Sequence, residues 1–319
     1  MHIIQETLDD LLRDVFQRLM QSPVHVQSSK GRNRELAGAL LEIRKPTARL
    51  SRTESKGTVF SCLGETLWYL ARSNRLDFIE YYLPTYKEFS DDGRTVYGAY
   101  GPRLFRMRRK VDQIDSVIRL LKRKPRTRQA VIQLFNAEDI LSPHEDIPCT
   151  CTLQFLIRAD RLHMLTHMRS NDAFLGLPHD VFAFTFLQEI IARSVGVELG
   201  LYKHAVGSLH LYDKHQAKAK QFLNEAWQAT ISMPDMPQGN PWPNIAKLIS
   251  AESRIRRGSE VNISSFRLPN YWADLVRLLQ IYAASRKNRD VAKIRSEMTS
   301  NVYNAYIDKR AAKSKSSKR

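Results

Sequence analysis

The sequence is poor in features that define several classes of protein. It has only three cysteines in 319 residues, and two of them, Cys149 and Cys151, are separated by one residue. This excludes the disulfide framework of a small secreted domain. Thirteen glycines and thirteen prolines are too few for a collagen-like or low-complexity chain, and 43% hydrophobic residues are too many for a disordered one. The sequence therefore predicts a folded chain with a large apolar core.

Long apolar runs are also lacking. No stretch approaches the roughly 20 apolar residues with which a helix crosses a bilayer. The N-terminal segment MHIIQETLDDLL is acidic and amphipathic, whereas a signal peptide is basic and then apolar. We expect a soluble, cytoplasmic protein that does not bind a membrane.

Positive charge is abundant and unevenly placed. Fifty Lys and Arg residues against thirty-three Asp and Glu residues give a formal net charge of +17, which predicts an anionic partner. Residues 101–128 contain eleven basic and two acidic side chains, and residues 309–319 contain six basic and no acidic ones. The segment 309–319 is small, polar and self-repelling, so we expect a disordered tail after a single domain at residues 1–308.

Hydrophobic periodicity predicts the elements of the fold. Helices are expected at residues 3–20, 60–72, 111–121, 180–195, 270–285 and 288–308, and strands at 36–44, 130–135, 152–168 and 201–212. The run 152–168 is typical of a hairpin that turns at Ala159-Asp160. A polar, basic loop is expected at 28–34. The pattern predicts one α/β (α+β) domain, a mixed β-sheet flanked by helices.

Two side chains are candidates for acid/base or nucleophilic chemistry, and each has a purely structural alternative role. Cys149 follows Pro148 at the entrance to a predicted strand, where a thiol is accessible, although a lone cysteine is usually an inert small hydrophobic residue. Glu65 lies on an apolar predicted helix, either as a general acid/base or as a salt-bridged structural residue.

A metal site is a third possibility, with weaker support. Cys149 and Cys151 could bind a metal together with His144, His163 and His167. A C-x-C pair without a second paired cluster is a weak zinc signal. We therefore expect no metal.

Six strings together resemble the thymidylate synthase superfamily. They are GETLWYL (64–70), GAYGPRL (98–104), DQIDSVIRLLKRKPRTR (112–128), PCTCTLQF (148–155), RSNDAFLGLPHD (169–180) and GSLHLY (207–212). Their order and approximate spacing match over about two-thirds of the chain. The resemblance implies the family's fold for a catalytic domain at residues 1–308. It also implies the family's reaction, in which a cysteine thiolate adds to C6 of a pyrimidine monophosphate and C5 then attacks the one-carbon unit of 5,10-methylenetetrahydrofolate.

The resemblance also implies roles for residues at matching positions. Cys149 corresponds to the nucleophile, Glu65 to the general acid/base that relays protons through water, and Tyr100 to a tyrosine that helps to activate the C5 proton. We expect the apolar setting of Glu65 to raise its pKa and the field of Arg169 to keep Cys149 ionised. The implied binding residues are Arg169 and Ser170 for the phosphate, Gln154 and Asp172 near the base, His210 and Tyr212 for the sugar hydroxyl, and Asp172 and Trp68 for the folate.

The family's assembly has a counterpart in the basic residues. Its members are two-fold dimers in which arginines of one subunit reach the phosphate bound by the other. Arg128 matches the first of an Arg-Arg pair, Gln129 replaces the second, and Arg126 is a nearby substitute. Arg32 and Arg34 are both candidates for the phosphate arginine of the early loop. The resemblance thus implies a homodimer with shared phosphate sites, and steering of anionic nucleotide and folate accounts for the excess positive charge without a nucleic-acid partner.

Position 180 departs from thymidylate synthases proper, which have asparagine there. An amide offers one donor and one acceptor to uracil, whereas the Asp180 carboxylate offers only acceptors. Cytosine presents an N4 amino donor, and its N3 should hold a proton after thiolate attack, so a carboxylate can accept from both. The cytidylate 5-hydroxymethylase branch of the family also carries Asp here. We therefore expect CMP or dCMP as the substrate.

Two further departures agree with that branch. Thr150 follows the nucleophile where thymidylate synthases usually have histidine, and a Lys/Ser tail replaces the short apolar ending that closes over folate. A site without that lid lets water meet the exocyclic methylene and gives a 5-hydroxymethyl product. Two alternatives stay open: a divergent thymidylate synthase that methylates dUMP, and a non-catalytic member of the fold that binds nucleotides or nucleic acid.

Overall fold

The fold is built on one mixed sheet. The computed structural model describes residues 1–51, 58–225 and 231–316. Within these ranges the strands are β1 (His2–Gln5), β2 (His25–Ser28), β3 (Gly31–Ile43), β4 (Val131–Gln133), β5 (Thr150–Arg158), β6 (Arg161–Asp172) and β7 (Glu198–Tyr212). Their order is β1-β3-β7-β6-β5-β4, with β2 paired to β3, and the pairs β1–β3 and β6–β7 are parallel. The expected mixed sheet is confirmed.

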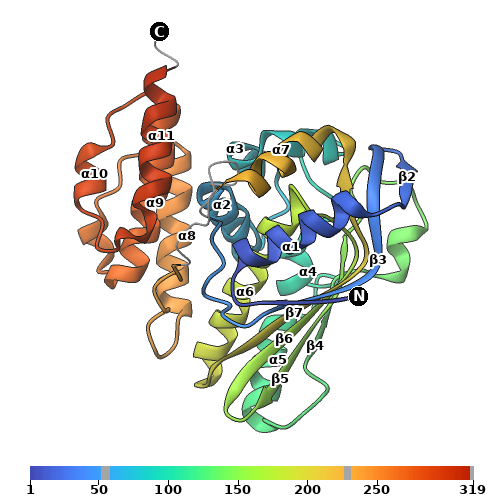
Figure 1. Ribbon diagram of the computed structural model, residues 1–319. Coiled ribbons are helices and arrows are strands. Elements are labelled where there is room, and N and C mark those ends of the chain that lie inside the picture. The colour runs from blue at the N-terminus through green and yellow to red at the C-terminus, as the bar shows by residue number, and fades with distance from the viewer. Residues whose placement is uncertain (52–57, 226–230, 317–319) are drawn as a thin grey trace.

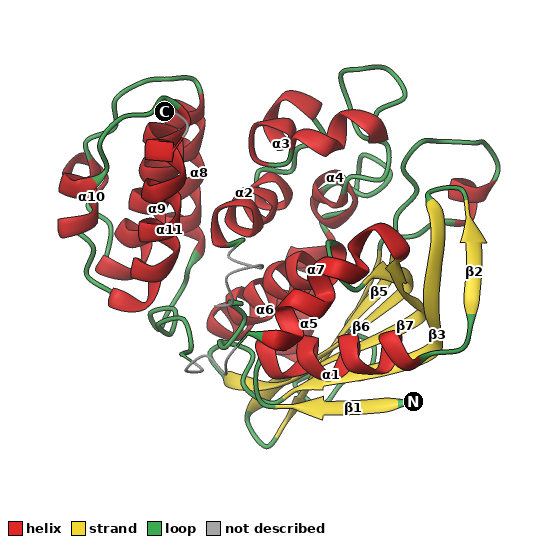
Figure 2. Cartoon of the chain, turned by 45° about the horizontal axis from the view of Figure 1, so that its top comes forward, coloured by secondary structure: helices red, strands yellow, loops and turns green. Residues whose placement is uncertain are grey.

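Helices cover the sheet and extend into a second group beside it (Figure 1, Figure 2). They are α1 (Leu8–Gln21), α2 (Val59–Leu70), α3 (Leu76–Tyr82), α4 (Tyr100–Phe105), α5 (Gln113–Arg123), α6 (Gly176–Val195), α7 (Asp213–Asn224), α8 (Trp242–Arg256), α9 (Asn270–Arg286), α10 (Ala292–Ser296) and α11 (Asn304–Ser316). Short 3-10 turns are η1 (Pro84–Phe89), η2 (Ala137–Ile140), η3 (Ile263–Phe266) and η4 (Asn301–Tyr303). Across the described ranges, no helix is both long and apolar enough to cross a bilayer.

The central helix is α6, which confirms the element expected at 180–195. It is buried along most of its length because it packs on β6 and β7 with one side and on α2 and α5 with others. It ends at Gly196, whose φ of +84° is the left-handed conformation that terminates many helices. Apolar side chains from these layers, and from α8, α9 and α11, join one continuous buried core.

The β5–β6 hairpin turns where the sequence predicted. Ala159 and Asp160 have φ values of +48° and +54°, as in a tight two-residue hairpin turn. The run expected as a buried strand at 130–135 is shorter and more exposed. Of this run, only Val131–Gln133 forms a strand, β4, which pairs with β5 at the end of the sheet. Val131 is 43% exposed, whereas Ile132 is buried. An edge position leaves one face of this strand in solvent.

The N-terminus forms a strand before the first helix. β1 pairs with β3, which buries Ile3 and leaves Ile4 exposed. α1 begins only after Thr7, whose side chain accepts a hydrogen bond from the Asp10 N–H and caps the helix. The helix expected over residues 3–20 is therefore wrong at its start, because pairing with a strand distant in sequence decides the conformation there.

The basic loop expected at 28–34 is a hairpin instead. β2 and β3 pair antiparallel up to Ser28 and Gly31, so only Ser29 and Lys30 form the turn. Gly31 has a φ of +120°, which a side chain would make strained. The hairpin places the positive charge of Lys30 at its tip.

The C-terminal helices form a group on the far side of α2 from the sheet (Figure 1). The single helix expected at 288–308 is divided into α10, η4 and the start of α11. α11 extends to Ser316, into the segment 309–319 that we expected to be disordered, and residues 317–319 lie outside the described ranges. Arg310 anchors α11: its guanidinium lies 4.2 Å from the Tyr282 ring centroid, and its Nε donates to Ser285 Oγ at 2.7 Å.

The opposite face of the sheet carries aliphatic side chains. Along β5, β6 and β7 the residues that alternate with the buried ones are mostly half-buried. They include Leu156, Leu165 and Leu201. This face, in contrast to the one under α6, is not sealed by the protein's own core.

Candidate active site

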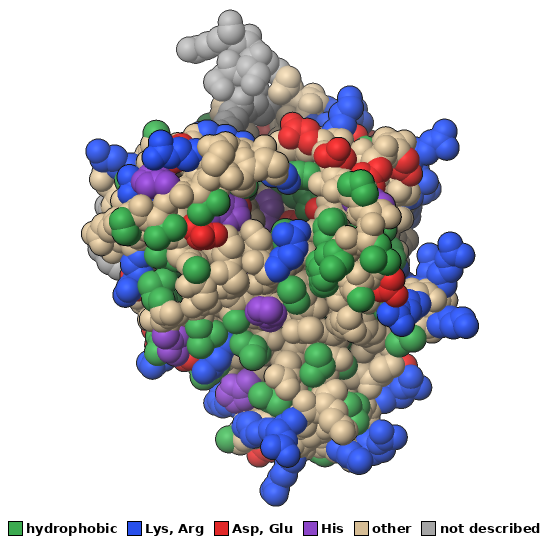
Figure 3. All heavy atoms as spheres, turned by 90° about the vertical axis from the view of Figure 1, so that its right-hand side faces the viewer, with side chains coloured by type: hydrophobic (Ala, Val, Ile, Leu, Met, Phe, Trp, Pro, Cys, Tyr) green, Lys and Arg blue, Asp and Glu red, His purple; other side chains and the backbone are tan. Residues whose placement is uncertain are grey.

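Several strand ends meet at one edge of the sheet. Because β3 and β5 run antiparallel to β7 and β6, the starts of the first two lie beside the ends of the others. The Arg169 N–H donates to the Cys149 carbonyl at 2.8 Å, and Asp172 pairs in register with His210. The side of the molecule on which β2 and β3 lie in Figure 1 is hollowed, and histidine, basic and acidic side chains surround the hollow (Figure 3).

The loop that carries Cys149 is held by Arg169. The guanidinium of Arg169 donates from Nε to the Pro148 carbonyl at 3.0 Å and from Nη2 to the Ile147 carbonyl at 2.8 Å. Cys149 itself stands directly before β5 and is partly exposed. In the ligand-free protein Arg169 therefore positions the loop that carries Cys149.

The Cys149 thiol is not ionised by this neighbour at neutral pH. Burial raises its pKa to about 11; Arg169 lowers it, but Asp146 and Asp180 oppose that effect. The expectation that the field of Arg169 keeps the thiol ionised is wrong for the ligand-free protein, because desolvation outweighs the positive charges of Arg169 and Lys30. A proton must leave Cys149 before or during attack.

Tyr100 is fixed near Cys149 by Thr150. The phenol oxygen of Tyr100 accepts hydrogen bonds from the Thr150 N–H at 3.1 Å and from Thr150 Oγ1 at 2.9 Å. Burial, followed by the charges of Asp180 and Cys149, raises the pKa of Tyr100 well above its usual range. The phenol is neutral, and its own proton is not used by either of these two bonds.

Glu65 lies on α2 inside a polar cage. Its Oε1 accepts from the hydroxyls of Tyr69 at 2.9 Å and Tyr86 at 2.5 Å, and its Oε2 lies 3.1 Å from His179 Nδ1. Burial alone would raise the pKa of Glu65, but His179 and the two tyrosines together lower it. We expected a raised pKa, and this is wrong because Tyr86 and His179, which join Tyr69 of the same helix around Glu65, come from segments that the local sequence does not show.

His179 is a site residue to which the sequence assigned no role. Its ring lies between Glu65 and the Ser61 hydroxyl, 3.1 Å from His179 Nε2. Burial lowers the pKa of His179, but Cys62 and Glu65 raise it to about 10. The available signal was an imidazole next to Asp180 in the mostly apolar string FLGLPHDVF, but its partners lie on another helix.

Asp180 follows His179 in the second turn of α6. Asn171 donates from Nδ2 to Asp180 Oδ2 at 2.7 Å. Burial, helped by the nearby charge of Glu65, raises the pKa of Asp180 to about 8. In the ligand-free protein this carboxyl group is therefore mostly protonated at neutral pH.

Besides Arg169, four of the expected nucleotide-binding residues lie along β6 and β7. Ser170 pairs with Ser208 and Asp172 pairs with His210, and the His210 and Tyr212 rings pack edge to face with centroids 4.9 Å apart. Asp172 Oδ1 also accepts from two backbone N–H groups that close the turn into α6, at 2.7 and 3.1 Å. Their contacts with a nucleotide stay a prediction.

Three expected residues have their side chains engaged elsewhere. Trp68 is 1% exposed and donates its indole N–H to the Arg75 carbonyl, so it is a core residue here and offers no surface to a folate. Gln154 alternates with buried residues of β5 and donates to the Arg128 carbonyl. Arg34 donates to two carbonyls at the end of α1 and ties that helix to β3.

The remaining basic candidates are exposed. Of the two early arginines, Arg32 has an exposed side chain that lies 3.8 Å from Asp213, so it is the one left for a phosphate. Lys30, at the tip of the β2–β3 hairpin, is a further candidate because its charge reaches Cys149. Arg126 and Arg128 are exposed on the segment between α5 and β4.

The histidines considered for a metal are held by different elements. His144 lies 2.8 Å from Asp91 and stacks on Tyr97, and His163 accepts a hydrogen bond from the Leu201 N–H. In the part of the chain that the structure describes, no group of three or more His, Cys, Asp and Glu side chains is placed to hold a metal ion.

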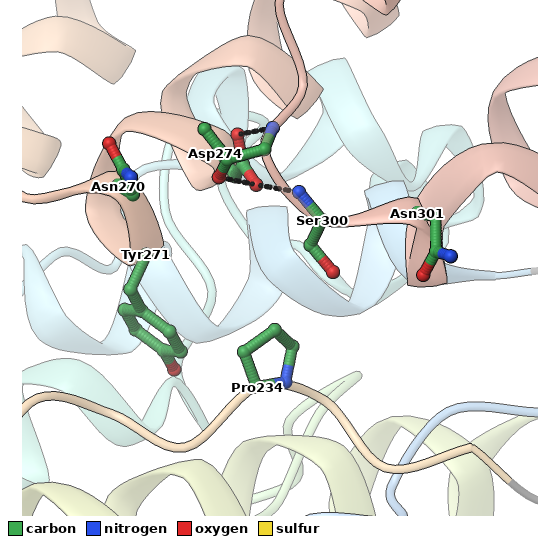
Figure 4. A pocket seen from close by; sticks show the side chains of 7 residues that line it. Pro234, Asn270, Tyr271, Asp274, Ser300 and Asn301 are labelled. Atoms are coloured by element: carbon green, nitrogen blue, oxygen red, sulfur yellow. Dashed lines mark hydrogen bonds between the residues drawn. The ribbon is translucent and has the colours of Figure 1, made fainter.

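A separate pocket lies between α9, η4 and the segment before α8 (Figure 4). Its most prominent charge, Asp274, accepts from the backbone N–H groups of Thr299 and Ser300 and from the Thr299 hydroxyl. Arg277 also donates to Asp274. This carboxylate ties η4 to α9, and its role is structural.

Comparison with known proteins shows what the chain resembles. A family model for thymidylate synthase matches residues 43–249. The chain is 34% identical over 166 residues to the deoxyuridylate hydroxymethyltransferase of Pseudomonas phage M6, which covers 50% of the chain and 46% of that protein. It is 32% identical over 169 residues to the thymidylate synthase of Bacillus subtilis subsp. natto, which covers 51% of the chain and 60% of that protein.

A longer match is to the deoxyuridylate hydroxymethyltransferase of Bacillus phage SP01. It is 29% identical over 220 residues, which cover 65% of the chain and 57% of that protein. The chain thus spans about half the length of the curated relatives it matches. The names of these relatives refer to two different activities, deoxyuridylate hydroxymethyl transfer and thymidylate synthesis.

The buried Asp180 predicts an unusual pH dependence of stability. Its pKa is 3.8 ordinarily and about 8 in the folded protein, so between these values the folded state binds a proton that the unfolded chain lacks. Stability contributed by this group therefore falls as pH rises through the window, by at most about 1.4 kcal/mol per pH unit. Asp180→Asn has no such proton, and we expect its melting temperature to rise relative to wild type from pH 5 to pH 8.

The matched control is Asp160→Asn in the exposed β5–β6 turn. It removes an exposed carboxyl group with the same change of residue type, and the trend of Asp180→Asn is compared with it at each pH. A constant or shrinking difference for Asp180→Asn would contradict the raised pKa.

Proposed function

The chain belongs to the thymidylate synthase family, and from this premise we propose that it transfers a one-carbon unit from 5,10-methylenetetrahydrofolate to C5 of a pyrimidine nucleoside 5′-monophosphate. The observation that carries the proposal is the cluster of Cys149, Tyr100, Asp180 and Glu65, which act on one another's protonation at the edge of the sheet. A nucleophile, a base-reading group and two proton-transfer groups thus lie together.

The cluster suits covalent activation of a pyrimidine. Attack of the Cys149 sulfur on C6 forms a C–S bond and moves the electrons of the C5–C6 double bond to C5, which becomes the nucleophile. Because the thiol is neutral in the ligand-free protein, its proton has to be taken up as the bond forms. Tyr100 and Glu65 are the groups that we propose to move protons at C5 and on the base.

We propose a cytidine monophosphate, CMP or dCMP, as the preferred nucleotide. Asp180 faces the cluster with a carboxyl group that the Asn171 amide orients. As a carboxylate it offers two acceptors to the N4 amino group and the protonated N3 of the cytosine adduct, and such charge-assisted bonds favour the ionised form. The substrate would then offset the desolvation that keeps Asp180 protonated in the ligand-free protein.

A uridine monophosphate is the second candidate, and one observation favours it. A protonated Asp180 has one donor and one acceptor, as asparagine has, and its pKa of about 8 means that this form dominates at neutral pH without ligand. The relatives of Pseudomonas phage M6 and Bacillus phage SP01 are named for deoxyuridylate. The two candidates therefore differ in the protonation state of a single carboxyl group.

For the product, we propose the 5-hydroxymethyl nucleotide, with methylation as the alternative. In the covalent adduct, water attacks the exocyclic methylene, the C5–C6 double bond re-forms, and the sulfur leaves C6. The water loses one proton, and the step needs no reductant. An ionised Glu65 is suited to accept that proton.

We also propose a homodimer in which Arg128, with Arg126 beside it, reaches the phosphate bound by the partner subunit. Both side chains are exposed. The aliphatic sheet face that carries Leu156, Leu165 and Leu201 is the surface that a second copy would cover.

Cys149 should be the essential thiol. We expect Cys149→Ala to abolish tritium release from C5 of labelled CMP and dCMP in the presence of methylenetetrahydrofolate, because no C–S bond can form. Cys62→Ala and Cys151→Ala are the matched controls and should keep most of the activity. Equal loss in Cys151→Ala and Cys149→Ala would refute the assignment.

Asp180 should set the base preference in a pH-dependent way. Wild type is expected to favour CMP or dCMP over dUMP, and Asp180→Asn should shift the ratio of kcat/KM values towards dUMP by about 10- to 100-fold, the worth of a charge-assisted pair. In wild type, the relative use of dUMP should rise as pH falls below about 8, the pKa of Asp180. Asp180→Asn should lose that dependence.

A wild-type preference for dUMP at pH 9, where Asp180 is ionised, would remove the cytidylate proposal and leave the uridylate alternative. Mass spectrometry of the product from each nucleotide separates the hydroxymethyl from the methyl group.

Mixed dimers test the shared phosphate site. Cys149→Ala and Arg128→Ala, each inactive alone, should recover up to about a quarter of wild-type activity when subunits exchange, because half of the dimers are hybrids with one complete site. Cys149→Ala mixed with Glu65→Gln is the control. Both residues belong to the cluster of one chain, so each subunit of the hybrid lacks one of them and no complete site forms. Recovery in neither mixture, with exchange demonstrated, would contradict a phosphate contact from the partner.

A further inference from the structure

We infer that His179 is a positioning residue that carries a proton on both ring nitrogens and thereby holds Glu65 as a carboxylate, the form that accepts protons. This inference deepens the proposed function and rests on it for its role in turnover. Its structural basis is the row formed by Glu65, His179 and Ser61, with spacings of 3.1 Å from Oε2 to Nδ1 and 3.1 Å from Nε2 to Oγ.

The proton on Nε2 follows from the hydrogen bonds of Ser61. The Ser61 hydroxyl has one hydrogen, and it donates this to the Thr58 carbonyl at 3.0 Å, which can only accept. Ser61 Oγ can therefore only accept from His179, so Nε2 carries a hydrogen. The two contacts of the Ser61 hydroxyl thus indicate that His179 Nε2 is protonated.

The proton on Nδ1 follows from Glu65. A carboxylate has no hydrogen to give, so a stable contact between Nδ1 and Oε2 needs the hydrogen on the nitrogen. With both nitrogens protonated, the His179 ring is a cation. Glu65 Oε1 meanwhile accepts from the hydroxyls of Tyr69 and Tyr86, so every contact made by this carboxyl group stabilises its ionised form.

The other titratable groups around the pair are one thiol, three phenols and two carboxyl groups. On α2 these are Cys62 and Tyr69, on η1 Tyr86, on α4 Tyr100, on α6 Asp180 and before β5 Asp146. Burial raises the pKa of Asp180 to about 8 and also raises that of Asp146, so these two carboxyl groups resist ionisation. His179 is the positive charge that allows Glu65 to ionise first, and Cys62 and Glu65 together raise the pKa of His179 to about 10.

This arrangement determines in which proton-transfer steps of the reaction Glu65 can take part. A carboxylate held in this way accepts a proton from water or from C5, but it does not start the cycle as an acid. The attack of water on the exocyclic methylene, proposed above, needs such a base. His179 would act through Glu65 without touching the reacting atoms.

The kinetic test is the pH profile of C5 tritium release. His179→Gln keeps an amide donor but removes the charge, and we expect the pKa of Glu65 to rise. The ratio of kcat/KM at pH 6 to that at pH 8.5 should therefore fall about tenfold or more below the wild-type ratio, since one pKa unit corresponds to a factor of ten. His144→Gln, at a histidine outside the cluster, should leave the ratio unchanged.

Recovery at high pH separates this role from a structural one. His179→Gln should regain much of its activity at pH 8.5, whereas a merely structural residue would cost the same factor at every pH. Uniform loss with an unmoved acidic limb would overturn the inference.

A second measurement needs no turnover. In wild-type protein with labelled histidine, the ring resonance that is missing from His179→Gln should titrate near pH 10 rather than near 6.5. Glu65→Gln should lower that midpoint. If that resonance titrates in the ordinary range, His179 is neutral at pH 8 and the inference fails, whatever the enzyme's activity. A high midpoint in a protein that turns over no pyrimidine nucleotide would instead keep the ion pair and refute the proposed function.

Discussion

The backbone hydrogen bond between Arg169 and Cys149 joins the two halves of the site. It continues the antiparallel pairing of β5 and β6 by one residue beyond the strand, and so places the loop before β5 beside the end of β6. The Arg169 side chain then binds two carbonyls of that loop. Because β6 also pairs in parallel with β7, the same strand aligns Asp172 with His210. Without this register, the thiol and the residues proposed to bind the nucleotide would not share an edge.

Three ionisable groups of the cluster are desolvated, yet they take different protonation states. Cys149 and Asp180 are mostly neutral at pH 7 because two favourable partners each do not compensate for burial. Glu65 is ionised because two phenols and one imidazole face it. The number of donors that reach a buried group, more than the degree of burial, thus decides its charge.

Without a substrate, Cys149 and Asp180 are not in the ionised forms that the proposed chemistry uses. A cytosine adduct would bring two donors to Asp180, and a phosphate would compete with the loop carbonyls for Arg169. Both changes occur at groups that act on the Cys149 thiol. The proposed chemistry therefore couples binding of the nucleotide to the protonation state of its nucleophile.

Local sequence determined those features whose physics is local. The Ala159-Asp160 turn depends on two left-handed residues, α6 on a long apolar run, and the position of Cys149 on a motif around it. Tertiary structure alone decided the partners that come from distant segments: β1 beside β3, Arg34 on the end of α1, and His179 against Glu65. The pKa directions belong to this second group, since they depend on desolvation and on donors supplied by other elements. Periodicity reports which face of an element is buried, but it does not report what that face meets.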